Sequence, residues 1–165
     1  MLEINIDSSL KKAERYQSLI PQLESLFLDE KDLIANMANL CAVLKSEFSF
    51  FWVGFYFKRK EELVLGPFQG PLACTRISLG KGVCGKAASD KKTIVVDDVN
   101  AFPGHIACSA ESNSEIVIPV VKNNSTIFVL DVDSEHLSNF DNTDKEYLEA
   151  ICALLTKSSE TKHLL

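Results

Sequence analysis

The stretch from Gly66 to Cys108 constrains the fold most, because it concentrates the residues that turn a backbone. It holds six of the seven glycines and three of the five prolines of the chain. Glycine permits backbone conformations that are closed to other residues and proline fixes φ, so such a segment turns often and brings distant side chains together. It also holds three of the five cysteines. We therefore interpret the stretch as a site built from loops, and its three thiols as a redox site.

The composition is that of a folded domain of ordinary size. With 165 residues, 46% of them hydrophobic, the chain has enough apolar surface to bury a core without structural staples. We expect a single domain over residues 1–165. The net charge of −6 comes from scattered acids, which disfavours nucleic acid and anionic membranes as partners.

The N-terminus and the cysteines indicate the compartment. No apolar run approaches the roughly 18 residues of a membrane helix, and the first residues lack the basic and apolar regions of a signal peptide. We therefore expect a cytoplasmic protein, whose cysteines are more often catalytic or metal-binding than structural. An odd count of five cysteines also argues against a closed disulfide framework. Two of them, Cys41 and Cys152, fall on apolar helix faces and are expected in the core.

Hydrophobic periodicity predicts helices at both ends of the chain. A stripe of apolar residues runs over 10–27 with Pro21 inside it, so we expect that helix to kink or to restart there. Asp29 is the expected cap of a second helix, and the two N-terminal helices together occupy about 10–46. A terminal helix, capped by Asn142 or Thr143, covers about 140–157.

The strands and site loops lie between these helices, over about 48–133. An aromatic and β-branched run at 48–57 predicts a buried strand that begins one hairpin. A second hairpin joins strands at 114–121 and 126–132 through an Asn-Asn turn. The predicted fold class is therefore α+β, with a central antiparallel sheet and helices on one face.

Cys108 is the candidate nucleophile. It follows a Pro-Gly-His turn, and His105 lies three positions before it. A thiol attacks only as its thiolate, and an isolated cysteine has a pKa of about 8.5. An imidazolium at His105 or a cluster of backbone amides would stabilise that thiolate. The alternative is a loop cysteine that only packs, but the segment is too polar to be core.

The other two thiols of the stretch have different surroundings. Cys84 lies in Gly-Val-Cys-Gly, where glycine allows a turn into a short helix whose first amides would favour the thiolate. These glycines lack the spacing and the Gly-Lys-Ser/Thr ending of a nucleotide-phosphate loop. Cys74 follows Pro71 in a loop, which suits a thiol that moves to form a disulfide, although packing explains it too. The cysteine spacing does not fit a structural zinc site, which usually pairs its ligands about two to four residues apart.

Three acids and two aromatic residues form a second group of candidates. Asp131 and Asp133 alternate along one predicted strand and so share a face, while Glu115 opens another strand. Converging carboxylates bind an ammonium group or share a proton with a substrate oxygen, and the alternative is a solvated strand end. Trp52 and Tyr56 share one face of the aromatic strand, where they form either core or an aromatic wall beside a ligand.

Eight segments form a recognisable pattern, in order, over roughly residues 30–155. They are 36–40 (Asn-Met-Ala-Asn-Leu), 52–56 (Trp-Val-Gly-Phe-Tyr), 65–70 (Leu-Gly-Pro-Phe-Gln-Gly), 73–74 (Ala-Cys), 80–85 (Gly-Lys-Gly-Val-Cys-Gly), 104–108 (Gly-His-Ile-Ala-Cys), 114–117 (Ser-Glu-Ile-Val) and 129–134 (Val-Leu-Asp-Val-Asp-Ser). The pattern resembles the free methionine-(R)-sulfoxide reductases. The resemblance implies the GAF fold, an α+β ligand-binding domain, and a homodimer that acts on the free amino acid.

The resemblance also implies a mechanism. Cys108 attacks the sulfoxide sulfur, methionine leaves, and a sulfenic acid remains on Cys108. A second thiol condenses with it to a disulfide, which thioredoxin reduces by exchange. The family gives this resolving role mainly to Cys74, with Cys84 as a second route. Glu115, Asp131 and Asp133 match the acids that hold the sulfoxide and the amino group, and Trp52 and Tyr56 match the aromatic wall around the methyl group. No metal and no bound cofactor are implied.

Two positions depart from the pattern. Ser109 stands where most relatives carry Asp, which makes the charge beside Cys108 less negative. Phe128 stands where most carry Gly, which fills either the sheet or the pocket wall. The alternative function is a non-catalytic GAF sensor of a small ligand or of oxidation. A chain of 165 residues leaves no room for the output domain that such a sensor needs, so the enzyme is favoured.

Overall fold

The computed structural model describes residues 4–105 and 110–161. Its helices are α1 (Lys12–Leu26), α2 (Leu33–Phe48), α3 (Gly82–Asp90) and α4 (Asn142–Ser158), with a short 3₁₀ helix η1 (Val99–Ala101). Its strands are β1 (Trp52–Arg59), β2 (Glu62–Gln69), β3 (Arg76–Ser78), β4 (Ile94–Val96), β5 (Ser114–Lys122) and β6 (Ser125–Ser134).

The strands form one sheet in the order β3-β2-β1-β6-β5-β4, and every adjacent pair is antiparallel. Asn123 and Asn124 connect β5 to β6 with φ angles of 50° and 59°. Asparagine tolerates this left-handed conformation, which a tight two-residue hairpin turn requires. The predicted α+β class with a central antiparallel sheet is confirmed.

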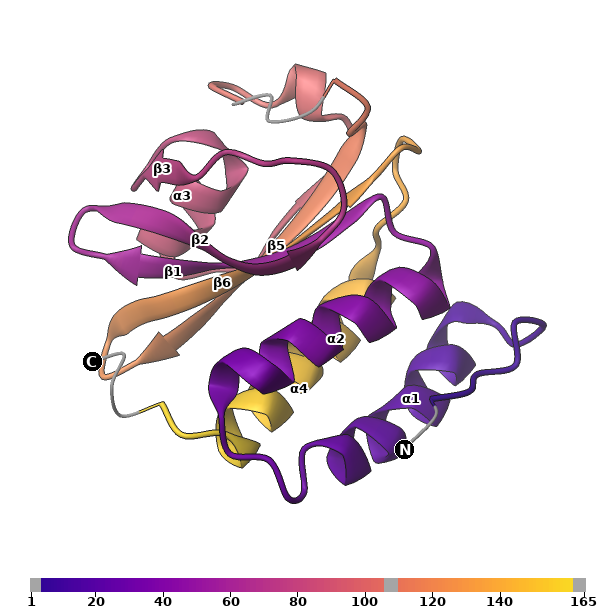
Figure 1. The fold of residues 1–165 in the computed structure, drawn as a ribbon. Coiled ribbons are helices and arrows are strands. Elements are labelled where there is room, and N and C mark those ends of the chain that lie inside the picture. The colour runs from indigo at the N-terminus through magenta and orange to yellow at the C-terminus, as the bar shows by residue number, and fades with distance from the viewer. Residues whose placement is uncertain (1–3, 106–109, 162–165) are drawn as a thin grey trace.

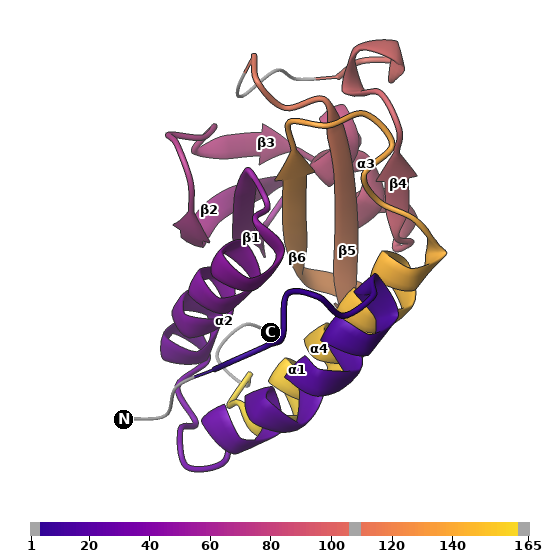
Figure 2. The same ribbon diagram turned by 90° about the vertical axis from the view of Figure 1, so that its right-hand side faces the viewer.

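The helices divide between the two faces of the sheet. Figures 1 and 2 show α1, α2 and α4 gathered on one face, as predicted, while α3 and the loops around it lie on the other. Helices α2 and α4 contact the sheet directly, and α1 packs on α4. The sheet therefore separates a helix face from a second, smaller layer.

Alternation along the strands sends neighbouring side chains into these two layers. In β1, Val53, Phe55 and Phe57 belong to the core against the large helices. Trp52 and Tyr56 belong to the cluster beneath α3. Because β1 is buried on both faces from Trp52 to Phe57, this part of its sequence is apolar without interruption.

Phe128 and the two helical cysteines lie in the helix-side core. Phe128 is fully buried and packs edge-on against Phe55 and Phe57, with ring centroids 5.7 and 6.3 Å apart. Its side chain therefore fills the layer between sheet and helices, not the opposite face. Cys41 and Cys152 are buried in the same core, which confirms their predicted packing role.

Two predicted boundaries near the first strand were wrong. Helix α2 ends at Phe48 and is followed by the C-cap Ser49, whose φ of 56° is left-handed, so β1 begins at Trp52 rather than at 48. The aromatic run thus supplies the end of a helix as well as a strand. Asp32, not Asp29, caps α2 with its carboxylate.

Of the two outcomes expected at Pro21, the restart does not occur, because α1 continues through the proline as one helix with buried residues on both sides of it. Two further elements differ from the prediction. Asp141 caps α4, in place of the predicted Asn142 or Thr143. The edge strand β3 (Arg76–Ser78) was not predicted, since a strand of three residues has too little periodicity to read.

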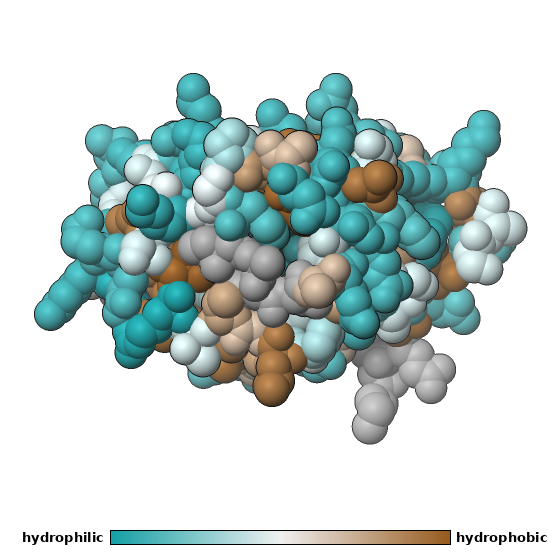
Figure 3. Space-filling model, turned by 90° about the horizontal axis from the view of Figure 1, so that it is seen from above, coloured by the Kyte–Doolittle hydropathy of each residue, from teal (hydrophilic) through white to brown (hydrophobic). Residues whose placement is uncertain are grey.

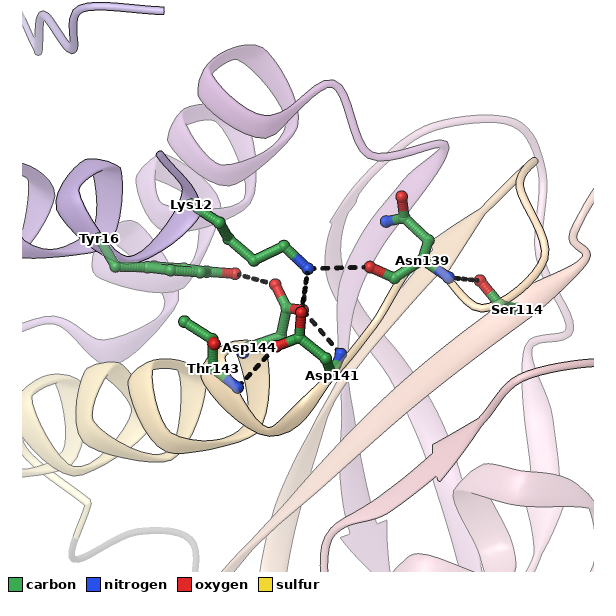
Figure 4. A network of polar contacts seen from close by, with 7 residues as sticks. All are labelled: Lys12, Tyr16, Ser114, Asn139, Asp141, Thr143 and Asp144. Atoms are coloured by element: carbon green, nitrogen blue, oxygen red, sulfur yellow. Dashed lines mark hydrogen bonds and ion pairs between the residues drawn. The ribbon is translucent and has the colours of Figure 1, made fainter. Parts of the chain in front are cut away.

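A polar network joins α1 to the start of α4 and to the start of β5. Figure 4 shows its members: Lys12, Tyr16, Ser114, Asn139, Asp141, Thr143 and Asp144. Lys12 Nζ and Tyr16 Oη donate to the Asp144 carboxylate at 2.5 and 3.0 Å. Asp144 is only 1% exposed, so these two donors supply the partners that a buried carboxylate needs.

Within the described part of the chain, no helix is both long and apolar enough to cross a bilayer.

Candidate active site

A pocket lies between the sheet and α3. Its walls come from β1, β3, β5, β6, α3 and the loops that follow β2 and η1. Figure 3 looks onto the side of the molecule that carries these loops, where hydrophilic surface surrounds smaller hydrophobic patches. The predicted site residues that line the pocket are Trp52, Tyr56, Cys84, Glu115, Asp131 and Asp133. Six of the eight predicted residues, from four separate elements, therefore meet in one place.

Strand register brings the three carboxylates together. Asp133 pairs with Trp52 of β1 on one side and with Glu115 of β5 on the other, so these three residues form a row across the sheet. Asp131 lies two residues along β6 and therefore on the same face, as predicted. Glu115 and Asp131 are only 6% and 7% exposed, so they are not a solvated strand end.

Two glycines make room for the Trp52 indole. A Cβ on Gly54 would lie 2.2 Å from the Trp52 ring, and one on Gly70, whose φ is +143°, would lie 2.5 Å from it. Any side chain at either position would displace the indole. Trp52 Nε1 donates to the carbonyl oxygen of Pro71 at 3.1 Å, and its ring stacks on Tyr56. The aromatic pair is thus held flat against the sheet as one wall of the pocket.

Cys74 lies on the loop between β2 and β3, directly after Ala73, which lines the pocket. Its carbonyl oxygen accepts a hydrogen bond of 3.0 Å from Tyr56 Oη. Cys74 is disulfide-bonded, whereas Cys84 is a free thiol. Cys108, the predicted nucleophile, lies with Ser109 outside the described residues, so its role remains a prediction.

Cys84 does not have the environment that the sequence predicted. It is close to the start of α3, as expected, but it is only 3% exposed and its Sγ lies 3.9 Å from Glu115 Oε1. Burial and the neighbouring charges of Asp131 and Glu115 raise the pKa of this thiol well above its usual range. The prediction that helix amides favour its thiolate was therefore wrong, because burial and two carboxylates oppose them.

The carboxyls themselves titrate abnormally. Burial, followed by repulsion from neighbouring carboxylates, raises the pKa of both Glu115 and Asp131 well above the usual range. Burial raises the pKa of Asp133 to about 6. Among the described residues that line the pocket, none is a lysine or an arginine. The described lining therefore supplies no lysine or arginine to balance these carboxyls, and is suited to accept a cation or to hold a shared proton.

Ser112 is a site residue that the sequence prediction missed. It lines the pocket, and its Oγ donates to Asp133 Oδ1. The predicted pairing of β5 with β6 could have identified Ser112, because the segment before β5 continues beside β6. There Asn113 N donates to Ser134 O at 2.8 Å. A residue three positions before Glu115 thereby returns to the pocket.

His105 also lines the pocket. Its Nδ1 is buried and has no hydrogen-bond partner among the described residues. Burial lowers the pKa of this imidazole, which favours the neutral ring over the imidazolium considered from the sequence.

Comparison with known proteins identifies the family. The GAF domain family model matches residues 28–157. GAF domain-containing protein A of Dictyostelium discoideum is 57% identical, over 87% of this chain and 92% of that protein. The free methionine-R-sulfoxide reductase of Escherichia coli (strain K12) is 42% identical, over 90% of each chain. The X-ray structure of free methionine-R-sulfoxide reductase from Neisseria meningitidis, in complex with its substrate, matches with a TM-score of 0.92 and 51% identity, over 96% of this chain and 95% of that one. The chain belongs to the free methionine-R-sulfoxide reductase family.

Membership of the free methionine-R-sulfoxide reductase family makes the chain an oxidoreductase with the GAF fold. In this reductase the pocket also contains donor atoms that suit a metal ion. One atom each of Cys84, Glu115 and Asp131 lies within 4.8 Å of the other two. The spacing of the cysteines along the sequence did not reveal this set, because its members come from α3, β5 and β6.

Proposed function

We propose that the chain reduces free L-methionine (R)-sulfoxide to L-methionine, with thioredoxin as the external reductant. The observation that carries this proposal is the convergence of three buried carboxylates and an aromatic pair on one pocket, next to the loop of Cys74. Relatives named for this activity cover nine tenths of the chain, and one of them was crystallised with its substrate.

A free amino acid suits the pocket because it brings its own cation. An ammonium group beside Glu115, Asp131 and Asp133 stabilises their ionised forms, which burial otherwise disfavours. Trp52 and Tyr56 offer an apolar wall to the S-methyl group. A methionine within a polypeptide has no ammonium group to fill this role, so a restriction to the free amino acid follows.

In the proposed chemistry, thiols carry the electrons and a carboxyl supplies a proton. The thiolate of Cys108 attacks the sulfoxide sulfur while a protonated carboxyl supplies a proton to the oxygen. Methionine leaves with two electrons, and the oxygen remains on Cys108 as a sulfenic acid. The thiol of Cys74 then attacks that sulfur and water leaves, which forms a disulfide that the dithiol of thioredoxin reduces by exchange.

We assign the main resolving role to Cys74 and a secondary one to Cys84. The support is the difference between their surroundings, since Cys84 is a deeply buried free thiol with a raised pKa, a state that slows its attack on a sulfenic acid. Cys74 lies on a loop, is only partly buried and is already disulfide-bonded.

The decisive assay couples the protein to thioredoxin, thioredoxin reductase and NADPH, with each diastereomer of free methionine sulfoxide supplied separately. We expect NADPH consumption with the (R) form and none with the (S) form. If circular dichroism shows that the protein is folded and no NADPH is consumed with the (R) form, the proposed activity is rejected.

Cysteine variants separate the roles of the thiols. Cys108→Ser should release no methionine even in a single turnover, because a hydroxyl is a poor nucleophile toward sulfoxide sulfur. Cys74→Ser should release about one methionine per site and then stall, since the sulfenic acid lacks its partner. Cys84→Ser should be milder, and Cys152→Ser is the matched control for a buried thiol outside the pocket. A full first turnover by Cys108→Ser, with none by Cys84→Ser, would show that the nucleophile is misassigned.

Three accompanying proposals concern conditions and assembly. We propose that the reaction requires no metal, that the protein acts in the reducing cytoplasm, and that it forms a homodimer as the family resemblance implies. Activity after exhaustive chelation tests the first. Localisation of a tagged chain and sedimentation velocity test the second and third.

A further inference from the structure

Three side chains of the pocket place metal-ligating atoms close together, and the proposed reaction does not require this grouping. Cys84 Sγ lies 3.9 Å from Glu115 Oε1, and an oxygen of Asp131 lies within 4.8 Å of both. In tetrahedral zinc sites the metal–ligand bonds of about 2.0–2.3 Å separate the ligand atoms by roughly 3.5 Å. Shifts of about 1 Å or less in these side chains therefore suffice to surround one ion.

A second observation that points to a ligand is a buried oxygen of Asp131 without a hydrogen-bond partner among the described residues. Asp131 is 7% exposed, it lines the pocket, and its Oδ1 is buried without a hydrogen-bond partner among the described residues. A buried carboxylate oxygen without a partner is costly and rare. The ion pairs among the described residues engage other acids, so no lysine or arginine of the described ranges is seen to pair with Asp131 or Glu115.

The donor set selects the class of ion. Magnesium and calcium prefer oxygen ligands alone, whereas a cysteine with two carboxylates suits a thiophilic divalent ion such as zinc or cadmium. The thiol of Cys84 loses its proton to solvent as the metal–sulfur bond forms, and no electron is transferred.

We propose that the reduced protein binds one thiophilic divalent cation through Cys84, Glu115 and Asp131, and that this ion excludes substrate from the pocket. The ion is an inhibitor and not a cofactor, because it occupies two of the acids that receive the substrate ammonium. Only the exclusion of substrate from the pocket rests on the proposed function. The binding itself rests on the geometry of the three ligands.

The test uses cadmium as the probe, because a cadmium–thiolate bond gives an ultraviolet charge-transfer band. Reduced, metal-free protein is titrated with Cd²⁺ in the absence of substrate. We expect the band to saturate at one ion per chain, to persist in Cys108→Ser and to disappear in Cys84→Ser. Loss of the band in Cys108→Ser, or its retention in Cys84→Ser, overturns the assignment.

A matched pair of variants distinguishes coordination from general electrostatics. Asp131→Asn should weaken Cd²⁺ binding by about 10-fold or more, as loss of a ligand does. Asp133→Asn makes the same chemical change on the same strand and should weaken it less. Equal losses in the two variants reject the site, as does unchanged affinity in Asp131→Asn. If Asp131→Asn fails to fold, Glu115→Gln takes its place in the same comparison.

The two proposals fail in different ways. Zinc should raise the apparent KM for methionine sulfoxide in wild type, and chelation should reverse the effect. A protein that reduces the (R)-sulfoxide but gives no Cys84-dependent band refutes the metal site alone. A protein that gives the band but reduces no sulfoxide refutes the reductase function alone.

Discussion

The two faces of the central sheet use the same strands for opposite purposes. On the helix face, β1 and β6 contribute Phe55 and Phe128 to a core that is apolar and closed to water. On the pocket face, the same strands contribute Trp52 and two aspartates, which line a cavity without a compensating lysine or arginine in the described residues. The helix face packs its apolar side chains closely, whereas the pocket face leaves buried polar atoms of Asp131 and His105 without a hydrogen-bond partner among the described residues.

The difference shows how a small domain tolerates a costly site. An ionised carboxylate in an apolar setting destabilises the folded state unless a partner is present. The burial of Asp131 and Glu115 therefore opposes folding until a ligand cation arrives. Burial of the large aromatic and aliphatic side chains on the helix face supplies the stabilising free energy. Substitutions on the two faces should then affect activity and stability in opposite ways.

The largest effect is expected from Asp131→Asn on the pocket face. Loss of a buried charge partner of the substrate ammonium costs about 2–5 kcal/mol, which is a fall of roughly 30-fold to several thousand-fold in kcat/KM. Denaturant unfolding should show equal or greater stability, because the substitution removes a buried charge whose Oδ1 has no hydrogen-bond partner among the described residues. Asp144→Asn is the matched control on the helix face and should lower stability while kcat/KM is retained. A destabilised but fully active Asp131→Asn would contradict the comparison.

Phe128→Ala tests the helix face. Removing a fully buried phenylalanine should lower the unfolding free energy by about 3–5 kcal/mol. KM should be unchanged at temperatures where circular dichroism shows the variant folded, because Phe128 does not line the pocket. Phe128→Leu should recover most of the stability. A large increase in KM for the folded Phe128→Ala protein would show that the two faces are coupled.

The pH dependence of stability sharpens the contrast through Asp133. Burial raises its folded pKa to about 6, above the ordinary range of an aspartate, so the folded state binds its proton more tightly than the unfolded state does. Its stabilising contribution is complete below about pH 4 and is lost as pH rises through about 6, an effect on the order of 2–3 kcal/mol.

The measurement is the unfolding free energy of wild type minus that of Asp133→Asn, determined without substrate between pH 4 and pH 7. This difference should fall as pH rises. If the difference rises over the same range, the pKa of Asp133 is lowered in the folded state. Asp133 would then behave like a carboxylate in an ordinary surface ion pair.

The smallest effect is expected from Lys12→Met in the network of Figure 4. Lys12 bonds to the buried Asp144, but 36% of the lysine side chain is exposed, so water screens the pair. We expect a loss of about 1–2 kcal/mol in unfolding free energy, with kcat unchanged. The double variant Lys12→Met with Asp144→Asn should lose less than the sum of the two single variants, and simple additivity would show that the pair is not coupled.

The sequence by itself determined the features that depend on local periodicity. The alternation of β1 and β6 predicted that Asp131 and Asp133 share a face and that Trp52 and Tyr56 share one. The helical stripes predicted the buried positions of Cys41 and Cys152, and the Asn-Asn pair predicted the hairpin turn. Each of these follows from residues close together in the chain. Local pattern failed at Phe48, where an aromatic side chain suits a helix end as well as a strand.

Only the tertiary structure decided the electrostatics of the site. The start of α3 alone favours a thiolate at Cys84, but β5 and β6 place Glu115 and Asp131 against it and the packing excludes water. The same pairing returns Ser112 to Asp133. Burial and charge pairing depend on which distant strands come to lie together, and no local period in the sequence records that. The chain therefore specified its candidate residues one at a time, and packing decided how the Cys84 thiol and the three carboxyls titrate.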